Sequence, residues 1–286
     1  MNLRLISIAC LLLISALTMG CSERSRSATT NTSQSQNINT SFVIAGSGTN
    51  LPVTAKLAEG YYDKTGIRID VPGSIGSDGA INAVKSGSLE LGLISKHLTS
   101  NEHTAGLKEI PYAKVAVVFG SHINTPDSTI SDADIISIIK GSKTTWSNGT
   151  KIHVFLRQNN DSSNLALFNV VPGYREALMD AYEQQRWQII YRDSDMSEVL
   201  KENKGAFGLT VSTEIAKEGV KTKPLDYNGI SPTTENIRNG TYKLTEDLSF
   251  IYKDTLSNRA ADFLEYVFSN EGQEILEKWG SSPIRR

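Results

Sequence analysis

The sequence predicts an α/β protein whose mostly parallel sheet is flanked by helices. Three observations lead to this class. From residue 42 onward, short apolar runs typical of strands alternate with capped, helix-like segments. Two loops rich in glycine and serine, 45–52 and 73–79, each lie between an apolar run and the start of a helix. The chain beyond residue 40 is also long enough for two lobes of ordinary size.

The first elements follow a strand, helix, strand order. A strand is expected over 42–45, and Asn50 is expected to cap a helix that carries Pro52 in its first turn and ends at Gly66. The nearly all-apolar run 114–120 is typical of a buried strand, and we expect it to leave the first lobe. Between them we expect strands at 68–71 and 89–94 and a short helix at 80–85.

The second half repeats this alternation. Ser131 is expected to cap a helix that runs to Lys140, with Asp134 close to the positive end of the helix dipole. A strand over 152–156 ends at Arg157, directly before a polar stretch. We expect the later strands at 206–210 and 248–252, and the later helices at 165–171, 174–185, 195–203, 212–218 and 259–268.

The N-terminus predicts secretion. Residues 1–20 combine one positive charge with an apolar run too short to span a bilayer, as in a signal peptide. Residues 17–21 resemble a bacterial lipobox, with the usual leucine one position early, which makes Cys21 the expected lipidated (palmitate-bearing) residue. Ordinary signal cleavage nearby is the alternative. Residues 21–40 then comprise this cysteine and a flexible tether rich in Ser, Thr and Asn.

Composition argues against several classes of function. The formal net charge of −2 disfavours a nucleic-acid partner. The histidines show no metal-ligand spacing, and Cys10 is lost with the signal peptide, so we expect neither a metal nor a cofactor. No Gly-x-Ser-x-Gly motif occurs, and residues 141–144 lack the pattern of a phosphate loop, so we expect no enzyme.

Polar residues follow the ends of several predicted strands, which is where open α/β sheets bind ligands. Loops that lead into helix N-termini offer unpaired N–H groups to an anion, and Arg157 adds a planar, permanently charged donor. A surface ion pair is the plainer role for Arg157, and helix capping is the plainer role for the hydroxyls. Asp78 and Asp161 are interpreted as N-terminal caps; if either faces the ligand, it must accept a proton from it. The candidate residues are Thr49, Asn50, Ser77, Ser95, Arg157, Ser162 and Ser163.

Together with the runs 205–209, 228–233 and 263–273, the last expected to be one helix, these loops resemble the phosphate-binding proteins of ABC transporters. The resemblance covers nearly the whole body of the chain. It implies the type II periplasmic-binding-protein fold, with two lobes joined by two crossovers and a ligand cleft between them. The first lobe would comprise 41–118 plus 226–286, and the second 119–225.

The same resemblance implies the anion contacts. It places the backbone N–H groups of one contact at Asn50 and Leu51, and side-chain contacts at Ser77, Arg157, Asp161, Ser162 and Ser163. Ser95 stands where well-studied members carry the aspartate that accepts the proton of phosphate. Asp161 or Asp78 is the hypothetical replacement for that acceptor.

We therefore expect a lipid-anchored solute-binding protein in the periplasm or on the cell surface. It would capture a small tetrahedral oxyanion, foremost inorganic phosphate, as a monomer and deliver it to an ABC permease of the inner membrane. A lipoprotein that acts as an oxyanion sensor or surface interaction module, without transport, is the alternative that the sequence leaves open. A phosphoester hydrolase would need a nucleophile or metal set that the sequence does not display.

Overall fold

The computed structural model describes residues 41–217 and 219–286. The expected signal peptide, Cys21 and the whole of the tether lie outside these residues. Within the described part of the chain, none of the helices has both the length and the apolar character needed to cross a bilayer.

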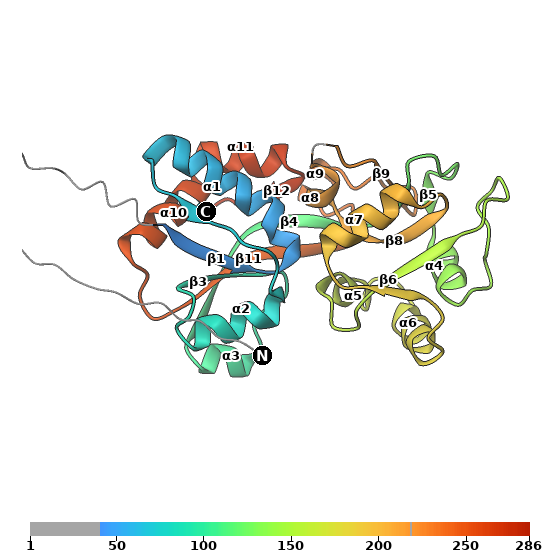
Figure 1. Ribbon diagram of the computed structural model, residues 1–286, viewed down its shortest axis with the longest axis horizontal. Helices are drawn as coiled ribbons and strands as arrows, with labels where there is room; N and C mark the ends of the chain where they lie inside the picture. The colour runs from blue at the N-terminus through green and yellow to red at the C-terminus, as the bar shows by residue number, and fades with distance from the viewer. Residues whose placement is uncertain (1–40, 218) are drawn as a thin grey trace, which may run out of the picture. The chain divides into compact units, whose positions relative to one another are not determined.

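A ten-stranded sheet forms the framework (Figure 1). Three strands at each end are parallel, and two long strands between them run antiparallel to their neighbours. The predicted α/β class is thus confirmed. In spatial order the strands are β2 (Ile69–Asp70), β1 (Phe42–Gly46), β3 (Leu91–Ile94), β11 (Thr245–Lys253), β4 (Leu107–His122), β8 (Ala206–Val211), β6 (His153–Arg157) and β7 (Gln188–Ile190).

Strand β4 connects the two ends of the sheet. Its first part pairs with β11, and its middle residues 113–115 pair with β12 (Ser281–Pro283). Its last part pairs with β8 and β9 (Thr222–Pro224). It begins before the predicted 114–120, and its early residues are mostly only partly buried and include Pro111, so they lack the continuous apolar run on which the prediction was based. The register with β11 shifts at Leu248 and Ser249, opposite Pro111, which lacks the N–H that a regular ladder needs.

Helices cover both faces of the β1 end of the sheet (Figure 1). On one face α1 (Leu51–Thr65), α10 (Asn258–Phe268) and α11 (Asn270–Lys278) bury Leu57 and Phe263 against β1 and β3. On the other face lie α2 (Gly76–Lys85) and α3 (Ser100–Thr104). The prediction of one helix over 263–273 is wrong, because Ser269 ends α10 and its hydroxyl caps α11 by accepting from the N–H of Gly272.

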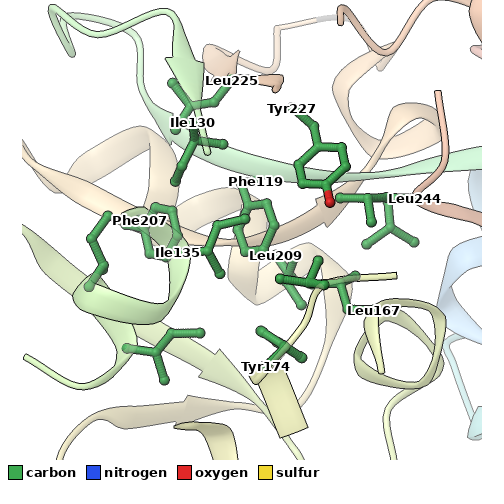
Figure 2. Packing of buried hydrophobic residues seen from close by; sticks show 14 of the residues in the cluster. Phe119, Ile130, Ile135, Leu167, Tyr174, Phe207, Leu209, Leu225, Tyr227 and Leu244 are labelled. Atoms are coloured by element: carbon green, nitrogen blue, oxygen red, sulfur yellow. The ribbon is translucent and has the colours of Figure 1, made fainter. Parts of the chain in front are cut away.

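The β6 end has its own core (Figure 2). Phe119 of β4 stacks on Phe207 of β8, with ring centroids 5.3 Å apart. This core also includes Tyr227 and Leu244, which come from the segment predicted for the first lobe, and the lobe limits stay a prediction. The helices that contribute to this core are α4 (Asp132–Ile139), α5 (Ser162–Leu167), α6 (Tyr174–Glu183) and α9 (Thr234–Arg238). Helix α7 (Asp193–Glu202) packs on the opposite face of the sheet, and α8 (Ser212–Ile215) follows β8. A separate two-stranded sheet pairs β5 (Thr129–Ile130) with β10 (Asp226–Tyr227).

Local signals explain several helix ends. Ser131 caps α4 as the sequence predicted, and Asp134 completes a reciprocal capping box by accepting from the backbone N–H of Ser131. Gly66 ends α1 with φ of 71°, in the left-handed region that glycine adopts without strain.

Candidate functional site

A polar cavity of about 380 Å³ opens at the carboxyl ends of β1, β3 and β6. Residues from both ends of the sheet line it, which is where an open α/β sheet places a ligand. The lining residues are Ser47, Gly48, Thr49, Ser74, Ile75, Gly76, Ser77, Asp78, Lys96, Arg157, Gln158, Asn160, Asp161, Ser162, Tyr191, Arg192 and Asp193.

The first wall is the 3₁₀ turn η1 (Gly48–Asn50), which joins β1 to α1. Ser47 and Thr49 line the cavity, whereas Asn50 and Leu51 do not. The N–H groups of Asn50 and Leu51 donate within the turn, to the carbonyls of Ser47 and Gly48, so neither is a free donor in this structure. The prediction that the Asn50 side chain caps α1 is wrong, because its Oδ1 accepts a hydrogen bond from Tyr112 instead (2.8 Å).

The second wall is the N-terminus of α2. This helix begins at Gly76, not at the predicted residue 80, so Ser77 and Asp78 lie in its first turn. The N-cap residue Ile75 makes no side-chain cap, but the hydroxyl of Ser74 accepts from the N–H of Gly76 (3.2 Å). The first-turn N–H groups after Gly76 are the donors that this helix N-terminus offers to an anion. Asp78 is not a cap; it forms an ion pair with Lys96 at the cavity wall.

Ser95, which follows β3, joins the walls from beneath. Its hydroxyl lies 2.6 Å from that of Ser47 and 2.9 Å from that of Ser162, and its backbone N–H donates to Oγ of Ser77 (3.2 Å). Ser95 is buried. The predicted residues Ser77, Ser95 and Ser162 are thus brought together, with Ser95 in a second layer behind the cavity surface.

Arg157, the last residue of β6, supplies the charge of the third wall. Its side chain is only 3% exposed, and Nε and Nη2 both donate to Oδ2 of Asp161 (3.1 and 2.8 Å). Oδ1 of Asp193 lies 3.4 Å from Nη2. Burial disfavours the charged guanidinium, but the attraction of Asp193 and Asp161 outweighs it and raises the pKa of Arg157 above its ordinary value.

Asp161 also organises the helix that follows. It is the N-cap of α5, as the sequence predicted, because its Oδ1 accepts from the N–H of Ser163 (3.1 Å). Ser162 lines the cavity, while Ser163 is buried behind it. With one oxygen on Arg157 and the other on the helix, Asp161 serves as a positioning residue.

The walls touch each other around the cavity. Thr213 donates from its hydroxyl to the carbonyl of Thr49 (3.2 Å), and the Ser95–Ser162 contact bridges β3 and α5. Gly48 approaches Asp193 so closely that a Cβ at position 48 would overlap the Asp193 carboxylate. The turn η1 and the N-terminus of α7 can therefore meet only because residue 48 has no side chain.

Sequence reasoning missed Asp193, Ser47 and Lys96. Asp193 is buried, and burial raises its pKa to about 6, although Arg157 pulls the value down. Asp193 was hard to identify from the sequence because the strand before it, β7, is only three residues long. Ser47 lies inside the first glycine-rich loop and shared its signal. No group of His, Cys, Asp and Glu within residues 41–217 and 219–286 is arranged to hold a metal ion.

Comparisons with known proteins agree with this architecture. Phosphate-binding protein PstS of Borreliella burgdorferi is 21% identical over 258 residues, covering 85% of this chain and 89% of the relative. A phosphate ABC transporter substrate-binding protein of Clostridium perfringens, solved with bound phosphate, is 25% identical with a TM-score of 0.75, and covers 86% of this chain and 100% of that one.

The fold extends to more distant proteins. The periplasmic molybdate-binding protein of Azotobacter vinelandii has a TM-score of 0.59 at 12% identity, covering 84% of this chain and 98% of that one, so it shares the fold alone. A family model described as a PBP superfamily domain matches residues 27–271. The chain belongs to this PBP superfamily and has the two-lobed fold of type II periplasmic binding proteins.

Proposed function

We propose that this chain is an extracytoplasmic solute-binding protein that captures a small tetrahedral oxyanion, foremost inorganic phosphate, for an ABC importer. The observation that carries the proposal is the buried Arg157 in a cavity whose lining combines several serine and threonine hydroxyls with three aspartates, two of them paired with Arg157 and the third with Lys96. Permanent charge and many small donors are what an oxyanion needs after it loses its water. The relative solved with bound phosphate, whose whole length this chain covers, points to the same ligand.

The proposed contacts come from three walls. Thr49 and Ser77 would donate from the first two walls, and Arg157 and Ser162 from the third. Nη1 of Arg157 carries two hydrogens and donates one to the carbonyl of Ile190 (3.4 Å), so one hydrogen is available to the ligand. Ser95 and Ser163 would orient these donors, and Asn50 and Leu51 would hold the turn that presents Thr49.

Thermal denaturation in the presence of oxyanions tests the proposal. A ligand at 100 times its dissociation constant adds about 2.7 kcal/mol, which raises the melting temperature of a chain of this size by roughly 5–10 °C. We expect phosphate to give such a shift, and sulfate and molybdate to give smaller ones at the same concentration. Absence of a shift with every oxyanion would refute the proposed function.

The membrane anchor is a second part of the proposal. Cys21 would carry the lipid that holds the protein on the outer side of a bacterial membrane, near the permease that it serves, and the chain would act as a monomer. Mass spectrometry of the mature N-terminus tests this. We expect a diacylated or triacylated Cys21, loss of acylation in Cys21→Ser, and unchanged acylation in the control Cys10→Ser. An unmodified mature N-terminus downstream of Cys21 would contradict it.

The predicted lobes, 41–118 with 226–286 and 119–225, would close over the ligand as bodies around the two crossovers. Small-angle X-ray scattering with and without phosphate tests closure. A smaller radius of gyration in the presence of phosphate is the expected result, whereas identical scattering curves would count against closure.

A further inference from the structure

Glu246 lies on β11, which packs against α5 of the third wall, and its side chain is buried. The residue is 4% exposed, and neither carboxylate oxygen has a hydrogen-bond partner among the described residues. Other carboxylates that are buried or half-buried are paired: the buried Glu214 accepts from Ser197 and Lys217, and the half-buried Glu109 accepts from Ser249. An ionised carboxylate in such a place is costly, so the position demands either a partner or a proton.

The charges around Glu246 favour the proton. Arg157 is the cation that acts on it, but Arg157 is already paired with Asp161 and faces Asp193. Both of these carboxylates repel a charge on Glu246, and burial adds the largest contribution, so that its pKa is raised to about 8. On β4, Val115 lies opposite Glu246, whereas Lys114 pairs with the neighbouring Asp247.

The same carboxyl group borders the hydroxyls of the third wall. Ser162 and Ser163 lie close enough that donation from either hydroxyl to an ionised Glu246 would lower its pKa. Ser162 is also linked to Ser95, and Ser95 to Ser47, so these hydroxyls form one chain that crosses the cavity floor. Each hydroxyl has a single hydrogen to donate.

The direction of that hydrogen decides what the cavity offers. If Glu246 is ionised, Ser162 and Ser163 turn their hydrogens toward it, away from the cavity. If Glu246 is protonated, it needs no donor, and the hydrogen of Ser162 is free to point at an anion. An ionised Glu246 would also add a third negative charge beneath a ligand that is itself negative.

We propose that Glu246 is a positioning residue that must carry a proton when the oxyanion is bound, so that anion affinity falls when this carboxyl group ionises. The inference rests on the proposed function. Its physical consequence is a protein that binds its anion well in neutral and mildly acidic surroundings and releases it as the surroundings become alkaline. When Glu246 starts ionised, binding takes up one proton from solvent to the carboxylate.

Phosphate titrations by calorimetry from pH 6.5 to 9 test the proposal, with wild type and Glu246→Gln measured side by side. The amide of Gln is neutral at every pH and similar in shape. The ratio of the two affinities removes the ionisation of phosphate itself, which is the same in both. We expect wild type to lose roughly tenfold in affinity relative to Glu246→Gln between pH 7 and pH 9, in proportion to its protonated fraction. Glu109→Gln, which changes a half-buried and paired carboxylate on β4, is the control and should follow wild type.

Each outcome decides the matter. If wild type and Glu246→Gln bind phosphate with parallel pH profiles, the inference on Glu246 fails while the proposed function stands. If wild type binds phosphate at no pH, both fail. Should Glu246→Gln not fold, carbon-13 NMR of the Glu246 carboxyl in wild type replaces it. Saturating phosphate should then raise the midpoint of that titration, and a lowered or unchanged midpoint would overturn the inference.

Discussion

The two sides of the cavity use different chemistry. The side built by η1, α2 and Ser95 presents hydroxyl and N–H donors, and its one ion pair, Asp78 with Lys96, lies at the wall. The side built by β6, α5 and α7 presents a buried arginine held by two carboxylates. One side therefore offers neutral donors, which water can solvate when no ligand is present. The other side holds the charged groups with which a buried ligand must interact.

This difference separates coordination from charge recognition. Neutral donors cost little to desolvate and contribute about 1 kcal/mol each. Buried charges must be paired before the ligand arrives, and here the two carboxylates of Asp161 and Asp193 fix Arg157 but together outweigh its single positive charge. We infer that the charged side decides which anion is bound, and that the neutral side completes its coordination.

The largest expected effect is the loss of Arg157. Arg157→Ala should weaken phosphate binding by about 2–3 kcal/mol, or roughly 30- to 150-fold, because the charge-assisted donor disappears and two carboxylates lose their counter-charge. Isothermal calorimetry measures the affinity. Arg186→Ala removes another arginine paired with an aspartate, outside the cavity, and should bind phosphate like wild type. Unchanged binding by Arg157→Ala would remove this residue from the site.

Asp193 should have the next largest effect, on selectivity. Because its pKa is raised only to about 6, Asp193 is ionised at pH 7.5 and can accept the proton that phosphate carries and sulfate lacks. Asp193→Asn should therefore weaken phosphate and strengthen sulfate, lowering the ratio of the two affinities by roughly 20-fold.

Asp195→Asn is the matched control, since this aspartate lies two residues further along α7 and pairs with Arg192. Its phosphate-to-sulfate ratio should equal that of wild type. An unaltered ratio in Asp193→Asn would return the acceptor role to Asp161 or Asp78, as the sequence hypothesis had it.

The close approach of η1 to α7 depends on Gly48. In Gly48→Ala the new methyl group displaces the Asp193 carboxylate or separates η1 from α7, at a cost of about 1–2 kcal/mol. We expect phosphate affinity to fall by about tenfold with little change in the melting temperature of the free protein. Gly73→Ala is the control, because a Cβ there has open space around it and no left-handed φ to relieve. Equal affinities for both variants would show that the sides need not meet so closely.

How much of this the sequence could predict follows the same division. The α/β class was readable because strand and helix periods alternate, and the Arg157 position was readable because a short apolar run ends there. The contact of Arg157 with Asp193 was not, since it depends on how β6 and β7 lie side by side. Glu246 was invisible for a related reason, because its isolation is a property of the packed sheet rather than of its neighbours in the chain.

At two places the structure differs from what the local sequence predicts. Asn50 has the side chain and position of a helix cap, yet the buried hydroxyl of Tyr112 takes its oxygen. Ser77 and Asp78 lie in a glycine-rich run that resembles a loop, yet the chain is already helical from Gly76, whose φ of 72° turns it sharply into α2. In both cases contacts distant in sequence decided between two locally acceptable conformations.

The smallest expected effect is on the neutral side. Ser77 accepts from the N–H of Ser95, so its own hydrogen remains for the ligand, and Ser77→Ala should weaken phosphate binding by about 1 kcal/mol, or roughly fivefold. Ser88→Ala removes an exposed hydroxyl that lies 3.0 Å from the hydroxyl of Ser86, and it should leave the affinity unchanged. The pair can be compared with Arg157→Ala in one calorimetric series. If Ser77→Ala costs as much as Arg157→Ala, the neutral side also takes part in charge recognition. The N-terminus of α2 with its Ser77 hydroxyl would then stabilise the negative charge of the ligand as strongly as the guanidinium does.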